Sequence, residues 1–72
     1  MSIKKVRAGK YRTNIIHRNC GGTIEIEKVG SGEFAWESYC DKCLDCDPNG
    51  WYSLTVAAHE ASSFFGPQER KP

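Results

Sequence analysis

The sequence lacks any long apolar run. Only 39% of its 72 residues are hydrophobic, and no stretch approaches the roughly 20 consecutive apolar residues that a membrane-spanning helix needs. The N-terminus, Met1-Ser2-Ile3-Lys4-Lys5, has no apolar signal segment either. We therefore expect a soluble cytoplasmic protein without a membrane partner, whose thiols stay reduced.

The usual signatures of catalysis are also missing. The chain has no nucleophile beside a base, no glycine-rich loop for a phosphate, and no carboxylate pair with a histidine. We expect that it is not an enzyme and that it takes no small-molecule substrate.

Acidic residues are absent from the first 18 positions, although the net charge is only +1. From position 19 to position 60 the balance reverses, and acidic residues predominate. A basic segment that meets phosphates would release counterions and bind nucleic acid in a salt-dependent way. A solvated N-terminus without a partner is the plain alternative. The candidate contacts are Lys4, Lys5, Arg7, Lys10, Arg12 and Arg18.

A chain this short buries too little surface for a hydrophobic core alone to stabilise it comfortably. Its four cysteines suggest the missing constraint, which is either a metal ion or two disulfides, unless the thiols are inert. Reduced thiols favour the metal.

Two short motifs carry ligands three positions apart: His17-x-x-Cys20 and Cys40-x-x-Cys43. That spacing lets a tight turn direct two donor atoms at one ion, about 2.0–2.3 Å away, and two turns complete a tetrahedron. Gly21-Gly22 supplies the backbone freedom such a turn requires. Mixed imidazole and thiolate donors indicate one Zn²⁺, and a site closed by four protein ligands indicates a structural ion.

Cys46 extends the second motif to C-x-x-C-x-x-C and leaves alternatives open. It is a free thiol, or it replaces His17 as a ligand, or the run holds an iron–sulfur cluster. A redox-active pair is a further alternative, but the turn formers at 47–50 do not suit the helix such a pair opens. His59 has no ligand at the same spacing, and we expect it on the surface.

Alternating apolar and polar residues predict strands at 11–16 and 23–29, with Ile24 and Ile26 facing inward. A turn at 30–33 leads to a returning strand at 34–39. This hairpin would bring Cys40 beside Cys20.

The turn formers at 47–50 precede an aromatic and β-branched segment, 51–56, that predicts another strand. Residues 57–65 fit a short helix or a loop. We divide the chain into a basic arm at 1–10, either flexible or an irregular entry strand, a metal-binding domain at 11–60 and a tail at 61–72.

With these motifs the chain resembles a zinc ribbon over residues 11–56. The resemblance implies a small, mainly β, metal-stapled fold with a three-stranded antiparallel sheet, and it assigns His17, Cys20, Cys40 and Cys43 as ligands. Zinc ribbons occur in transcription factors, polymerase subunits, ribosomal proteins, primases and small phage regulators. A ribbon with little else is similar to the accessory proteins of phages and mobile elements.

The first functional interpretation is a zinc-binding regulator that acts on nucleic acid or on the transcription machinery. The alternative is a phage-type inhibitor or adaptor that docks on a host protein without touching nucleic acid. In that case the acidic hairpin and Phe64-Phe65 would carry the contact. Trp36 and Trp51 are expected in the core, and the three tyrosines, Tyr11, Tyr39 and Tyr52, are better candidates for exposed contacts.

Overall fold

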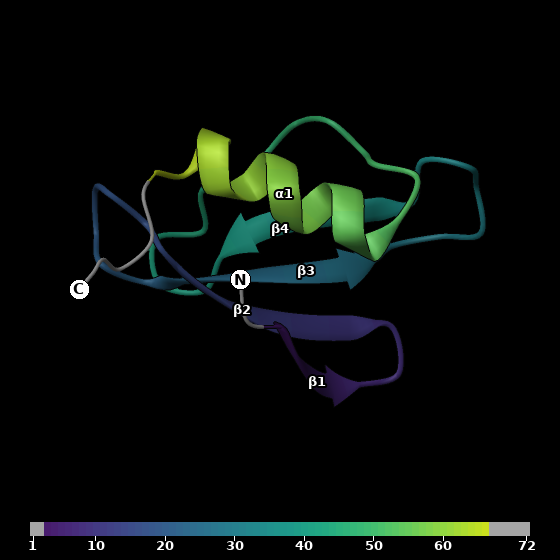
Figure 1. Cartoon of the computed structure of the whole chain (residues 1–72), viewed down its shortest axis with the longest axis horizontal. Coiled ribbons are helices and arrows are strands. Elements are labelled where there is room, and N and C mark those ends of the chain that lie inside the picture. The colour runs from purple at the N-terminus through teal and green to yellow at the C-terminus, as the bar shows by residue number, and fades with distance from the viewer. Residues whose placement is uncertain (1–2, 67–72) are drawn as a thin grey trace.

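The structure, a computed structural model, describes residues 3–66. It contains one antiparallel sheet of four strands in the order β1-β2-β3-β4, and one helix that covers a single face of that sheet (Figure 1). The elements in chain order are β1 (Ile3–Arg7), β2 (Lys10–Ile16), β3 (Thr23–Lys28), β4 (Trp36–Cys40) and α1 (Leu54–Phe64).

The sheet has one strand more than the three that the sequence predicted. The N-terminal segment forms β1, which pairs with β2 through contacts such as Ile3 opposite Thr13. Gly9 makes the connection with a φ of +80°, a backbone conformation that glycine adopts without a Cβ clash. Of the two alternatives for this segment, the entry strand is the one observed.

The strand predicted at 51–56 is wrong. Trp51 makes a single bridge with Trp36, and the chain then enters α1 three residues before the expected helix. Ser53 is the N-cap, and its hydroxyl accepts a hydrogen bond of 3.1 Å from the Val56 backbone N–H. This cap, together with burial of the small residues that follow it, outweighs the β propensity of the segment.

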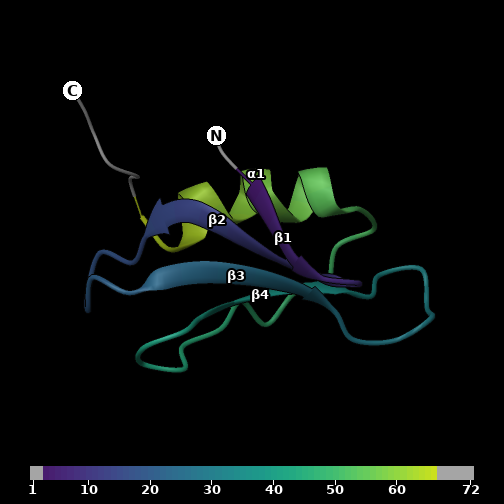
Figure 2. The ribbon, with the colours of Figure 1, turned by 90° about the horizontal axis from the view of Figure 1, so that it is seen from below.

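The core lies between α1 and the facing side of the sheet (Figure 2). Ile24 and Ile26 are fully buried there, as predicted, and Ile15 joins them from β2. The helix contributes the small buried residues Ala57, Ala58 and Ala61. Because the core is built mainly from these few side chains, a further constraint on the fold would add substantially to stability. Trp36 and Trp51 pack against this core while partly buried.

The opposite face of the sheet carries paired charges. Glu25 is only 4% exposed, and its carboxylate accepts from Lys10 at 3.3 Å and Arg12 at 2.9 Å. Glu27 pairs with Arg7 at 2.8 Å. Alternation along β3 therefore puts isoleucines on the core side and glutamates on the other side.

Among residues 3–66, no helix has the length and apolar character needed to cross a membrane.

Candidate metal centre

The first ligand turn connects β2 to β3. β2 ends at Ile16 and delivers His17, whose N–H donates to the Gly22 carbonyl at 2.8 Å, while the Gly21 N–H donates to the His17 carbonyl at 2.9 Å. Gly21 has a φ of +77°, which a residue with a Cβ adopts only under strain. These bonds fold the backbone so that His17 and Cys20 face the same point.

Gly22 is a glycine for a different reason. A Cβ at this position would lie 2.7 Å from the Cys40 sulfur and 2.7 Å from the Lys42 Cβ. The Gly22 N–H also donates to the Cys20 sulfur at 3.4 Å. The two ligand turns therefore touch at Gly22, and a side chain there would separate them.

The second ligand turn begins where β4 ends, at Cys40. The Cys40 N–H donates to the Asp45 carbonyl at 2.7 Å, and the Lys42 N–H donates to the Cys40 sulfur at 3.4 Å. Leu44, one residue after the second ligand, has a φ of +63°. It takes the conformation that Gly21 takes in the first turn, so the missing glycine in this motif is replaced by a strained leucine.

The two ligand turns lie at the same end of the sheet, where β3 begins and β4 ends (Figure 1), and their four side chains converge there. His17 Nδ1 lies 3.2 Å from the Cys20 sulfur and 3.3 Å from the Cys43 sulfur, and the Cys20 and Cys40 sulfurs are 3.3 Å apart. All four donor atoms lie within 4.8 Å of one another. Tetrahedral ligands at ordinary Zn–N and Zn–S distances are about 3.5–3.8 Å apart, so this arrangement fits one metal ion after small adjustments.

The cysteines are all free in the structure. The closest pair of sulfurs for which a distance is observed, Cys20 and Cys40, is 3.3 Å apart, well beyond the roughly 2.05 Å of a disulfide bond. The structure therefore contains neither of the two disulfides that the cysteine count alone would permit.

His17 is 3% exposed and is held in one orientation. Nδ1 faces the sulfurs, and Nε2 lies 3.4 Å from the Asp45 carboxylate. With a metal ion on Nδ1, Nε2 would carry the ring proton and donate it toward this carboxylate. The Phe65 ring packs edge-on against the imidazole, with ring centroids 5.4 Å apart. A carboxylate behind a ligating histidine fixes its tautomer and raises its basicity. Sequence reasoning missed both of these supporting residues, although Asp45 lies within the ligand turn.

The thiols differ in acidity. A hydrogen bond with His17 is the main cause that lowers the pKa of Cys20 to about 6. For Cys43, the Asp45 backbone N–H lowers the pKa, but burial and the neighbouring sulfurs of Cys20 and Cys40 outweigh it, so that this pKa is raised. At neutral pH the site thus presents a thiolate at Cys20, the form that binds metals.

Cys46 and His59 are not part of the group formed by the four ligands. Cys46 is exposed, and its N–H donates to the Asp45 side chain at 3.1 Å. His59 is exposed on α1. Neither side chain joins the donor atoms at the centre.

The basic candidates are dispersed over the described residues. Lys4 and Lys5 are exposed on β1, whereas Arg7, Lys10 and Arg12 form the ion pairs with Glu25 and Glu27. The Arg18 guanidinium donates to the carbonyls of Ser63 at 3.2 Å and Phe65 at 3.3 Å, so it connects the first ligand turn to the end of α1.

Comparison of the chain with protein-family models, with curated proteins and with solved structures finds no match. The assignment of His17, Cys20, Cys40 and Cys43 as a group that could hold a metal ion therefore rests on the donor atoms and their geometry.

Proposed function

We propose that this chain is a zinc-binding interaction module of the zinc-ribbon type. The observation that carries the proposal is the group of one imidazole and three thiols whose donor atoms lie within 4.8 Å of one another. One nitrogen and three sulfur ligands, close enough to surround one ion as a tetrahedron, suit Zn²⁺ better than Mg²⁺ or Ca²⁺, which prefer oxygen ligands. The ion would be structural, since four protein ligands leave no position for a substrate.

The ion would join two turns that are 20 residues apart between Cys20 and Cys40. Its binding free energy would then contribute directly to folding, as it does in other small zinc domains. His17 and Cys20 would hold the β2–β3 connection, and Cys40 and Cys43 would hold the end of β4. Thiolate ligands of this kind persist in a reducing compartment such as the cytoplasm.

Native mass spectrometry of protein purified without added metal tests the proposal. The expected result is one zinc per chain in the wild type and in Cys46→Ser, and no zinc with loss of folding in His17→Ala. A chelator should remove the zinc and unfold the wild type. A metal-free wild-type protein that stays folded, or an iron–sulfur cluster in place of zinc, would contradict the proposal.

We further propose that the partner is a protein. Three of the six basic candidates pair with two of the chain's own glutamates, Glu25 and Glu27, so part of the positive charge is offset and less is left for phosphates. Large apolar side chains are exposed instead, among them Phe34 at 60% and Tyr52 at 62%. The centroids of these two rings are 6.5 Å apart, and the rings pack edge to face. Neighbouring exposed aromatic side chains are enriched at protein interfaces. A component of the transcription machinery is the partner that the zinc-ribbon resemblance favours.

A pull-down with and without nuclease tests the partner class. A protein captured in both conditions, and lost on Phe34→Ala plus Tyr52→Ala with zinc retained, would support the proposal. A partner that disappears with nuclease would refute it.

Nucleic acid is the second candidate, and Lys4 and Lys5 are the residues that favour it. Both are exposed on the edge strand β1, and neither forms an ion pair among residues 3–66. If they contact phosphates, Lys4→Ala plus Lys5→Ala should reduce the slope of log K against log salt by about 2. An unchanged slope would remove these lysines from any nucleic-acid interface.

A further inference from the structure

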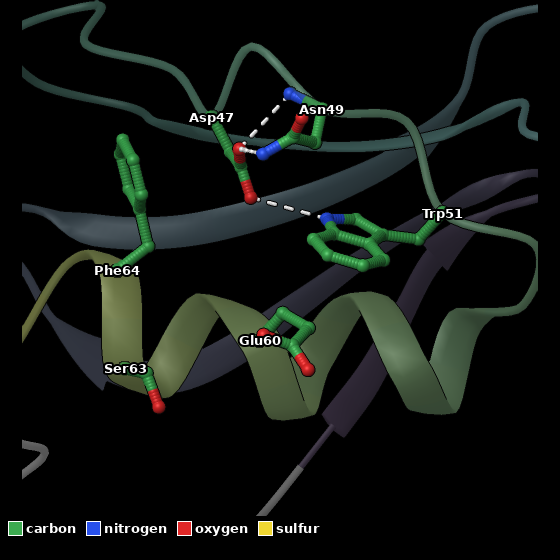
Figure 3. Close-up of a pocket in the computed structure, with 6 residues that line it drawn as sticks. All are labelled: Asp47, Asn49, Trp51, Glu60, Ser63 and Phe64. Atoms are coloured by element: carbon green, nitrogen blue, oxygen red, sulfur yellow. Dashed lines mark hydrogen bonds between the residues drawn. The ribbon is translucent and has the colours of Figure 1, made fainter.

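A cavity of about 240 Å³ lies between α1 and the loop that precedes it (Figure 3), and none of the four ligands of the metal centre lines it. We call it the acidic pocket. It is lined by Asp47, Asn49, Trp51, Glu60, Ser63 and Phe64.

Asp47 is the most buried polar residue of this pocket, with 3% of its surface exposed. One carboxylate oxygen accepts from the Asn49 backbone N–H at 3.0 Å and from the Asn49 amide at 3.2 Å, and the other accepts from the Trp51 indole N–H at 3.1 Å. All three donors are neutral. Within the part of the chain that the structure describes, no cation forms an ion pair with this carboxylate. A buried aspartate without a cation is unusual, because aspartates are almost never fully buried unless they are paired.

Glu60 adds a second carboxylate from α1. It lines the same pocket as Asp47, and among residues 3–66 it forms neither an ion pair nor a side-chain hydrogen bond. The pocket therefore combines two negative charges without a compensating positive charge from residues 3–66. A cation placed between them would interact favourably with both.

Two aromatic rings flank these carboxylates. Phe64 lies on one side of the pocket and Trp51 on the other (Figure 3). Aromatic faces attract cations, and tryptophan does so most strongly. Aromatic walls combined with carboxylates favour a flat organic cation over a hydrated metal ion, because the water shell of a metal ion keeps its charge away from the rings. The two carboxylates exclude phosphate and hence a nucleic-acid backbone.

We propose that the acidic pocket binds the guanidinium group of an arginine side chain from the protein partner. This inference rests on the proposed role as a protein-interaction module. A guanidinium stacks on an aromatic ring, is weakly hydrated and donates several N–H groups toward carboxylates, whereas an ammonium group is a compact and strongly hydrated charge. The pocket thus selects arginine over lysine.

The test follows the indole N–H of Trp51 by two-dimensional ¹H–¹⁵N NMR in the zinc-loaded chain of 72 residues. Because this N–H donates to Asp47, a cation that binds Asp47 will shift its resonance, while the indole N–H of Trp36 serves as the internal reference. The probe is the amide of N-acetylarginine at millimolar concentration. The expected result is a saturable shift for Trp51, with no comparable shift from the citrulline analogue, the neutral isostere of arginine.

Charge variants supply the matched controls. Glu60→Gln should weaken probe binding at least threefold, whereas Glu37→Gln, an equal change of charge at an exposed position of β4, should leave it unchanged. Equal affinity in Glu60→Gln and wild type, an equal response to citrulline, or no saturable shift would overturn the proposal. So would binding at least threefold tighter after Arg70→Gln plus Lys71→Gln, because the pocket would then belong to the chain's own tail.

Failure of the pocket can be distinguished from failure of the proposed function. If the metal-binding proposal is wrong, the sample lacks zinc by mass spectrometry. If the protein-partner proposal is wrong, the nuclease pull-down loses the partner while the probe still binds. A zinc-loaded, folded protein whose Trp51 resonance does not respond refutes the pocket alone.

Discussion

Replacement of Gly22 by alanine should damage the metal centre through one added methyl group. The new Cβ would lie 2.7 Å from the Cys40 sulfur and equally close to the Lys42 Cβ. Restoring a contact of at least 3.4 Å would displace the sulfur, the backbone or both by about 0.7 Å in total. Metal–ligand distances tolerate deviations of only about 0.2 Å, so the two turns cannot both keep their ligands in place.

The magnitude follows from the cost of overpacking, about 1–3 kcal/mol. Because zinc binding and folding are coupled in such a small domain, most of this cost should appear as weaker zinc affinity. We expect a loss of about ten- to a hundredfold, comparable to the effect of changing residues that support metal ligands. Competition with a chromophoric zinc chelator measures the affinity.

Gly32→Ala is the matched control, because a Cβ at Gly32 meets no atom within 4 Å. Its zinc affinity should equal that of the wild type. If Gly22→Ala also binds zinc within twofold of the wild type, the close approach of the two turns does not constrain the metal centre, and the reasoning is refuted.

Three further predictions concern the centre and its support. A thiol reagent should modify only Cys46 in the zinc-loaded protein and all four cysteines after chelation and denaturation; more than one reactive thiol before chelation would contradict the ligand assignment. Asp45→Asn should weaken zinc binding about three- to tenfold, because it removes the charge that faces His17 Nε2. This loss is smaller than for a buried carboxylate, since the Asp45 side chain is 52% exposed. A chelator competition that finds no change would exclude this role. Phe65→Ala should lower the free energy of unfolding of the zinc-loaded protein by about 3–5 kcal/mol, since Phe65 is 1% exposed. Phe64→Ala should lower it by about 1 kcal/mol or less, because Phe64 is 46% exposed. Equal effects of the two variants in chemical denaturation would refute this reasoning.

Local patterns were sufficient for several parts of the fold. The alternation at 23–29 predicted β3 and the inward direction of Ile24 and Ile26, which the structure confirms. The three-residue spacing of the ligands identified the four side chains that the structure brings together. These features are readable because side-chain direction along a strand, and the reach of two ligands in a tight turn, depend only on neighbouring residues.

Local patterns failed where two elements compete for the same residues. The segment at 51–56 has β propensity, and β4 is an edge strand that could pair with it. Within this segment, however, only Trp51 forms a bridge, to Trp36, before Ser53 caps α1. The helix prevails because it buries Ala57, Ala58 and Ala61 on the sheet. That gain depends on a surface which exists only after the strands have paired.

By itself the sequence determined the ligand types and their spacing, the alternation of the central strands, and the acid-free start of the chain. The tertiary structure decided what those residues do together. Strand register placed Lys10 and Arg12 beside Glu25, which neutralised part of the basic segment, and packing of α1 placed Glu60 and Asp47 on one cavity. Such contacts join residues distant in sequence, and no local pattern specifies them, because they follow from how the sheet pairs and where the helix packs.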